Sequence, residues 1–230
     1  MTRRTRTLYV YGIAARRPAR LGRGLGRERL RTVAGRGFVA IAGELEAPPM
    51  PEPAALRAHD AVVRRLARTC PAFLPARFGW TLAEPELRAA LAPHRGELKA
   101  ALEEVRGCVQ MIVRVFGETA AEQGPKTPPA AGGRGPGTTY MLERARAWQQ
   151  AESLPELEPL RARLTGLLRA ERQERHGQAG LVGTAYHLVE RGRLRTYRAR
   201  VRSAAAALGP VRVHVTGPWA PYAFGPRSLT

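Results

Sequence analysis

The folded part of the sequence opens with a run of aromatic and aliphatic residues, Leu8-Tyr9-Val10-Tyr11-Gly12-Ile13. Side chains of these types fit the pleated surface of a sheet, so the run predicts a first strand. Residues 37–45 have a similar composition and predict a second strand. Between the two lies a stretch rich in arginine and glycine, which we expect to form a flexible connection.

Helical spacing begins after the four prolines between positions 48 and 53. Leu56, His59, Val63 and Leu66 recur at steps of three and four residues, which predicts an amphipathic helix. We expect this helix to end before Pro71, because a proline disfavours helical geometry at the residue that precedes it.

From residue 73 the pattern alternates between strand and helix. Residues 73–82 predict a third, irregular strand and residues 109–116 a fourth. Apolar stripes over 85–91 and 98–105 predict helix between them. The order ββαβαβ therefore predicts an α+β first domain over residues 1–117, with a ferredoxin-like sheet that carries its helices on one face.

The composition changes after this domain, since residues 118–137 are rich in glycine and proline and predict a linker. Residues 138–230 are assigned to a second domain, a helical arm followed by a small α/β unit. The arm is expected up to His176, and Glu171 and Arg175 have the spacing of an ion pair on a helix surface. The unit beyond the arm is expected to contain a strand, a helix and a strand, near residues 180–189, 194–208 and 211–215.

The formal net charge is +19, and all but two of the 38 basic residues are arginine. Such a charge is typical of proteins with anionic partners, and residues 16–36 hold the densest cluster. A nucleic-acid-binding protein that uses this segment is therefore our alternative hypothesis. However, the cluster contains glycine and no aromatic residue, whereas nucleic-acid sites usually combine basic with stacking side chains. Arginine, alanine, glycine and proline also share GC-rich codons, so we favour a solvated surface.

Motifs of catalysis and cofactor binding are missing from the sequence. The five histidines stand apart from each other and from both cysteines, so we predict no metal site. Neither a Gly-x-x-x-x-Gly-Lys phosphate loop nor a Gly-x-Ser-x-Gly nucleophile elbow occurs. Cys70 and Cys108 lie among apolar residues, where a thiol is usually an inert, buried group. We predict no catalytic residue, no cofactor and no enzymatic activity.

The sequence contains no apolar run of about 18 residues, so we predict no membrane-spanning helix. Its basic N-terminus is followed by the strand-like run described above rather than by the apolar region of a signal peptide. These features predict a cytoplasmic protein.

Two motifs are distinctive, Leu74-Pro75-Ala76-Arg77-Phe78-Gly79 and the closing Val215-Thr216-Gly217-Pro218-Trp219-Ala220-Pro221-Tyr222-Ala223-Phe224. In order and separation they resemble the gas vesicle GvpF/GvpL family. Further segments resemble the same family, so the resemblance covers nearly the whole chain; they are residues 8–13, 93–98, 107–111 and 140–144.

The resemblance implies a two-domain α+β protein that is required for gas vesicle formation. It implies association with the small hydrophobic shell protein GvpA and with other accessory Gvp proteins. A shell subunit that assembles into ribs has apolar surface and strand edges that aggregate if left uncovered. A soluble partner can therefore act as nucleator, chaperone or minor shell component.

The C-terminal tail contains the residues that we consider for partner binding, Trp219, Tyr222 and Phe224. They lie beside three prolines, and Trp and Tyr are favoured anchors in interfaces. The other interpretation is that the tail folds back and fills the space between the domains. We favour this second interpretation, because a small protein usually recruits its aromatic residues to the core.

Overall fold

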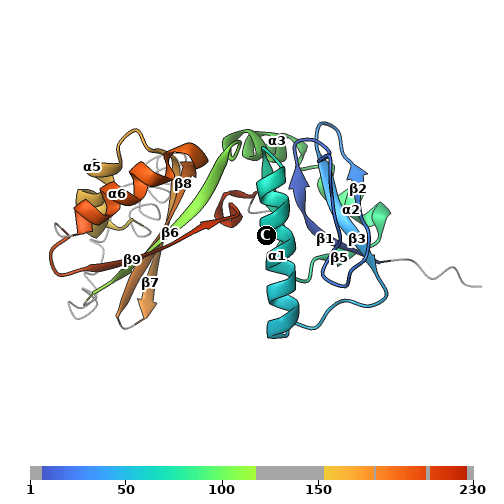
Figure 1. The fold of residues 1–230 in the computed structure, drawn as a ribbon, viewed down its shortest axis with the longest axis horizontal. Coiled ribbons are helices and arrows are strands. Elements are labelled where there is room, and N and C mark those ends of the chain that lie inside the picture. The colour runs from blue at the N-terminus through green and yellow to red at the C-terminus, as the bar shows by residue number, and fades with distance from the viewer. Residues whose placement is uncertain (1–6, 118–152, 179, 206–207, 227–230) are drawn as a thin grey trace, which may run out of the picture. The chain divides into compact units, whose positions relative to one another are not determined.

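The computed structural model describes residues 7–117, 153–178, 180–205 and 208–226 (Figure 1). The predicted linker at 118–137 lies outside these residues. The described residues form two sheets with helices packed against them, which confirms the predicted α+β class. None of the helices in the described ranges has the length and hydrophobicity needed to cross a lipid bilayer.

Contacts within the chain divide it into two compact units. The first consists of residues 1–110 together with 218–230, and the second of residues 111–217. This division differs from the predicted one in two respects. The strand predicted at 109–116 belongs mostly to the second unit, and the tail belongs to the first.

The sheet of the first unit is built around β1. Its strands follow the order β2-β3-β1-β4, and β5 also pairs with β1. All pairs in this sheet are antiparallel. The strands are β1 (Thr7–Ala14), β2 (Leu30–Ala34), β3 (Val39–Leu45), β4 (Phe73–Pro75) and β5 (Thr81–Leu82).

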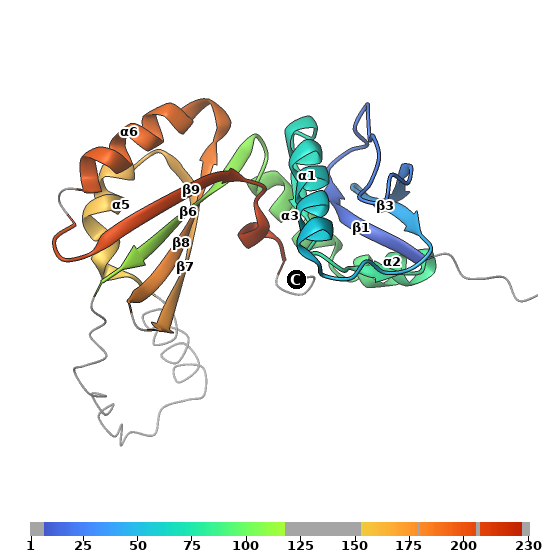
Figure 2. The same cartoon turned by 60° about the horizontal axis from the view of Figure 1, so that its bottom comes forward.

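Three helices cover this sheet: α1 (Pro53–Thr69), α2 (Glu84–Leu91) and α3 (Arg95–Glu104). α1 has a proline in its first turn, where the missing N–H costs nothing. Its apolar face, which includes Val63 and Leu66, packs against Tyr9 and Tyr11 of β1. Nearly every side chain of β1 is buried, and Figure 2 shows α1 and α2 on opposite sides of β1 and β3. The helices therefore cover both faces of the sheet rather than one.

The second sheet has the order β7-β8-β6-β9. Its strands are β6 (Cys108–Phe116), β7 (Leu168–Gln178), β8 (Leu181–Glu190) and β9 (Arg212–Trp219). Helices α5 (Glu158–Leu164) and α6 (Leu194–Ala205) bury Leu160, Leu164, Tyr197 and Val201 in one common core with this sheet. The described elements follow the order βαββαβ, so the ferredoxin-like arrangement predicted for the first domain occurs in the second unit.

Three strands, β6, β2 and β7, differ from the sequence-based expectation. β6 forms as predicted but is a central strand of the second sheet, because β4 and β5 already occupy the free edge of β1. β2 lies in the arginine- and glycine-rich stretch that we expected to be flexible. It is a short strand in which only Leu30 and Val33 are buried.

β7 replaces the end of the predicted helical arm. Residues 138–152 of that arm lie outside the described residues, and the described part is helical at the 3-10 turn Pro155–Leu157 and in α5. β7 lies at one end of the strand order and pairs with β8, so its charged side chains remain partly exposed. Glu171 and Arg175 do not pair with each other as on a helix. Instead, Glu171 binds Arg161 at 3.0 Å, and Arg175 binds Glu156 at 3.0 Å.

Gly12 allows β1 to pair with β3 on one side and with β4 on the other. Replacing Gly12 tests whether the close approach of β4 needs a residue without a side chain. Gly12 follows a shift in the β1–β3 register, and a Cβ atom at this position would lie 2.4 Å from the carbonyl oxygen of Leu74 on β4. We expect Gly12→Ala to lower the free energy of unfolding by about 3 kcal/mol, because the β1–β4 pairing must open. Chemical denaturation measures the change.

The matched control is Gly96→Ala. Gly96 lies in α3, and a Cβ atom there would meet no other atom within 4 Å. We expect this variant to be stabilised by roughly 0.5–1 kcal/mol, because alanine loses less backbone entropy in a helix. Equal effects of the two substitutions would contradict the role assigned to Gly12.

Candidate functional site

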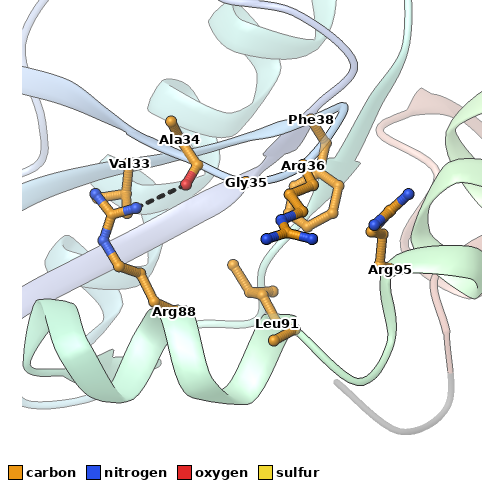
Figure 3. Close-up of a pocket in the computed structure, with 9 residues that line it drawn as sticks. Val33, Ala34, Gly35, Arg36, Phe38, Arg88, Leu91 and Arg95 are labelled. Atoms are coloured by element: carbon orange, nitrogen blue, oxygen red, sulfur yellow. Dashed lines mark hydrogen bonds between the residues drawn. The ribbon is translucent and has the colours of Figure 1, made fainter.

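A surface pocket of the first unit lies between the β2–β3 turn, α2 and the start of α3 (Figure 3). Its volume is about 420 Å³. Val33, Phe38 and Leu91 contribute apolar side chains that are almost fully buried. We refer to this feature as the hairpin pocket.

Three arginines surround the hairpin pocket: Arg36 from the turn, Arg88 from α2 and Arg95 from α3. Arg88 is held in place, since it donates to the backbone oxygen of Ala34 at 2.9 Å and forms an ion pair with Glu84 at 2.7 Å. Arg36 and Arg95 form no ion pair with any residue that the structure describes. Figure 3 shows both of their side chains above Leu91.

The composition of the hairpin pocket suits binding rather than reaction. Its side chains are aliphatic, aromatic or guanidinium groups, and none of these is a nucleophile or a general acid or base at neutral pH. An apolar group would displace water from Phe38 and Leu91, and a carboxylate beside it would meet Arg36 and Arg95. Sequence reasoning missed this pocket, because these residues are far apart in the chain.

The structure places the three tail residues in the first unit, in different surroundings. Phe224 is fully buried. Tyr222 is half-buried. Burial raises the pKa of its hydroxyl, and the charge of the nearby Asp60 carboxylate raises this pKa further. Trp219 is half-buried, and the Arg64 guanidinium lies 5.1 Å from its ring centroid. Arg64 also forms an ion pair with Asp60 one turn earlier on α1.

A partly buried hydrogen bond fixes the tail. The backbone N–H of Ala223 donates to Oε1 of Gln110 at 2.8 Å, and the Gln110 side chain is 2% exposed. Ala220 is buried in the core that Tyr9, Tyr11 and α1 form. Phe224 therefore anchors the tail, whereas Trp219 and Tyr222 keep part of their surface accessible.

The arginine-rich segment 16–36 is folded onto the first unit. Arg65 of α1 donates to the backbone oxygens of Leu21 and Arg23, and the Tyr11 hydroxyl donates to Glu28 at 2.6 Å. Arg17, Arg23 and Arg29 line a shallow surface pocket of about 420 Å³ together with Gly, Pro, Ala and Leu residues. No aromatic side chain lines it, so the stacking surface typical of nucleic-acid sites is missing there.

Two buried histidines form hydrogen-bonded clusters. In the first unit, Nδ1 of His59 lies 2.9 Å from the Tyr9 hydroxyl, and burial lowers the pKa of His59. In the second unit, Nδ1 of His187 lies 2.8 Å from the Tyr197 hydroxyl, and its Nε2 lies 3.3 Å from Glu171. His187 is 2% exposed and Tyr197 is 0% exposed, so a substrate could reach neither ring without opening the core.

The described residues contain no group of three or more His, Cys, Asp or Glu side chains placed to hold a metal ion. Neither Cys70 nor Cys108 forms a disulfide, and both side chains are buried, as expected for small apolar residues. Burial raises the pKa of the Cys70 thiol, which keeps it protonated and unreactive.

Glu171 connects the second-unit cluster to the surface, and its charge should stabilise the fold. Burial raises its pKa, but hydrogen bonds from His187 and Gln173 and the charge of Arg161 outweigh burial and hold the pKa below the ordinary value of 4.5. A lowered folded-state pKa stabilises the fold above pH 4.5, and this stabilisation is lost as pH falls through the folded-state pKa. We expect Glu171→Gln to cost roughly 1–3 kcal/mol at pH 7, and the difference from wild type to shrink below pH 4.5 in urea denaturation.

Glu158→Gln is the matched control, because Glu158 binds the same Arg161 at 2.8 Å from a side chain that is 67% exposed. An exposed ion pair contributes about 1 kcal/mol or less. If both variants lost the same stability, or if the Glu171→Gln effect did not depend on pH, the buried cluster would not have the role assigned to it.

Comparison with known proteins agrees with this architecture. The family model described as gas vesicle synthesis protein GvpL/GvpF matches residues 7–226. The gas vesicle protein L of Streptomyces sp. (strain CB03234) is 34% identical over 187 residues, which cover 74% of this chain and 68% of that protein. Crystal structures of the gas vesicle protein GvpF from Anabaena sp. PCC7120 and from Microcystis aeruginosa superpose with a TM-score of 0.69 each, at 17% and 18% identity. These matches cover 96% of this chain in both cases, and 96% and 99% of the two GvpF chains. The chain is therefore a member of the gas vesicle GvpL/GvpF family.

Proposed function

We propose that this protein acts in gas vesicle assembly by binding the shell protein GvpA and other Gvp proteins, as nucleator, chaperone or minor shell component. We place this binding in the cytoplasm and at the growing gas vesicle, and we assign the protein no catalytic role. The observation that carries the proposal is the hairpin pocket, whose apolar floor and arginine rim suit a segment of another protein.

The partner's chemistry explains why such a pocket is useful. A subunit that assembles into a continuous shell exposes apolar side chains before it is incorporated, and these associate without control if they stay in water. The exposed side chains of Ala34 and Ala92, with the small accessible parts of Phe38 and Leu91, offer an apolar surface to one such side chain. Arg36 and Arg95 then select a segment in which that side chain stands beside a carboxylate.

The tail provides a second, smaller contact in this proposal. Trp219 and Tyr222 are partly exposed beside Arg64, and an aromatic side chain next to an arginine is a common combination in interfaces. Phe224 acts indirectly, since it holds the tail in the core of the first unit.

The hairpin pocket is tested by charge reversal at its rim. We expect the double variant Arg36→Glu, Arg95→Glu to lose about tenfold or more in affinity for GvpA, because both guanidinium groups would be replaced by repulsive carboxylates. Co-expression with GvpA followed by quantitative pull-down of the full chain measures the loss.

The control for this variant is Arg20→Glu, Arg57→Glu. It makes the same change in net charge at two exposed arginines that form no hydrogen bond or ion pair with other described residues. Thermal unfolding of both variants shows whether the fold is kept. Equal loss of GvpA in the two variants, or normal binding by the pocket variant, would show that the pocket is not the contact.

Replacement of Trp219 tests the tail. We expect Trp219→Ala to lower the free energy of unfolding by about 2 kcal/mol, because the ring covers part of the first unit and contacts Arg64. We expect the loss in binding free energy for GvpA to be smaller than the loss in the free energy of unfolding. Unchanged melting together with lost pull-down would reverse this order and make Trp219 the main contact.

A further inference from the structure

The last part of the chain carries an unbalanced positive charge. All 19 acidic residues precede position 191, whereas eight arginines lie at position 191 or beyond it. Six of these arginines are exposed on the short 3-10 turn Arg191–Arg193 and on α6, which follows it directly. They are Arg191, Arg193, Arg195, Arg198, Arg200 and Arg202.

The arginines of α6 differ from seven others in how their charge is balanced. Arg31, Arg64, Arg88, Arg106, Arg161, Arg169 and Arg175 each form an ion pair with a carboxylate. Within the described ranges, no carboxylate pairs with Arg195, Arg198 or Arg202. These three recur at steps of three and four residues and therefore lie along one side of the helix.

A groove runs along this side of α6, between the helix and β9. Its volume is about 370 Å³. Arg198 and Arg202 stand on the helix side, and Val213 and Val215 of β9 lie opposite, partly buried against the core. Met111 and Val201 close the floor. Arg198 is held in place, since it donates to the backbone oxygen of Gly217 at 2.9 Å.

We propose that this α6–β9 groove binds an acidic, partly apolar segment of another protein. Carboxylates of that segment pair with Arg198 and Arg202, and with Arg195 further along the stripe. An aliphatic side chain of the segment packs on Val213 and Val215. Arginine suits this task, because its planar guanidinium can hold a carboxylate through two parallel hydrogen bonds.

The lining of the groove favours a peptide over a nucleic acid. A single-stranded nucleic acid needs aromatic side chains on which its bases stack, and none lines this groove. The aliphatic floor instead matches the side chains of leucine, isoleucine or valine. β9 also lies at one end of the described strand order, so an extended segment can approach it from the side.

This site is separate from the hairpin pocket and does not depend on GvpA as the partner. The two proposals are distinguishable, because the groove variants below leave Arg36 and Arg95 intact, and the pocket variant leaves α6 intact.

Fluorescence anisotropy of labelled probes tests the groove with the full chain. The first probe is a peptide that alternates glutamate pairs with leucine. In the second, glutamine replaces glutamate, and in the third, serine replaces leucine. The fourth is a single-stranded DNA oligonucleotide of mixed sequence. We expect the Glu–Leu peptide to bind at least tenfold more tightly than the other three at physiological salt.

The test variant is Arg195→Glu, Arg202→Glu. Neither side chain forms a hydrogen bond or ion pair with another described residue, so the fold should be kept. We expect this variant to lose about tenfold or more in affinity for the Glu–Leu peptide. Arg57→Glu, Arg114→Glu makes the same charge change away from the groove, since Arg114 alternates with the inward-facing Val113 and Val115 on β6. This control should lose less than about threefold, the effect of net charge alone.

Three results would overturn the proposal. Equal losses in both variants would mean that the peptide responds only to net charge. Equal binding of the glutamine peptide would remove the carboxylates from the interaction. Tighter binding of the oligonucleotide, lost in the α6 variant, would assign the arginines to phosphate recognition instead. The single variant Arg202→Glu repeats the measurement should the double variant fail to fold.

Discussion

The fold of the first unit depends on the hydrogen bonds of two tyrosine hydroxyls, those of Tyr9 and Tyr11 on its central strand β1. The Tyr9 hydroxyl lies 2.9 Å from His59 on α1 and accepts the backbone N–H of Gly79. The Tyr11 hydroxyl donates to Glu28 and accepts the N–H of Leu25. A buried hydroxyl without partners would cost several kcal/mol, so these contacts fasten α1, the arginine-rich segment and the loop after β4 to one strand. This is why a stretch rich in glycine is folded.

The second unit uses the same principle around His187. Its two ring nitrogens lie within hydrogen-bonding distance of Tyr197 on α6 and of Glu171 on β7, so helix and sheet are joined through one buried ring. Arg161 of α5 balances the Glu171 charge. Buried polar groups thus position the helices in both units, whereas the remaining arginines are free to face solvent. The charged surface of α6 follows from this division, since its inner face is held by Tyr197 and Val201.

The sequence predicts most helices and strands, but it predicts few of the strand pairings. Periodicity located α1, α6 and the strands at β1, β3, β6 and β8, because each buries a regular stripe or run. It could not assign β6 to the second sheet, since pairing depends on which edge of β1 the later strands occupy. β7 was mistaken for helix because its charged residues favour helices, and only its pairing with β8 places Glu171 opposite His187. The hairpin pocket had no local signal, and of the three aromatic tail residues considered from the sequence only Phe224 is fully buried.

The position of the acidic residues bears on the origin of the high charge. GC-rich codons account for a preference for arginine over lysine, but they act on every part of a gene alike. They do not explain why all 19 acidic residues lie before position 191 while α6 and β9 carry none. Elsewhere in the described chain, several arginines form surface ion pairs with carboxylates, among them Arg31, Arg106 and Arg169. An arginine stripe without such pairs repels itself, and this repulsion is relieved when carboxylates of a partner lie against it. The groove beside the stripe has an apolar floor on which such a partner can also bury surface. Composition therefore explains the choice of arginine, and the absence of acidic residues from α6 and β9 supports the proposal that this surface binds a carboxylate-bearing partner.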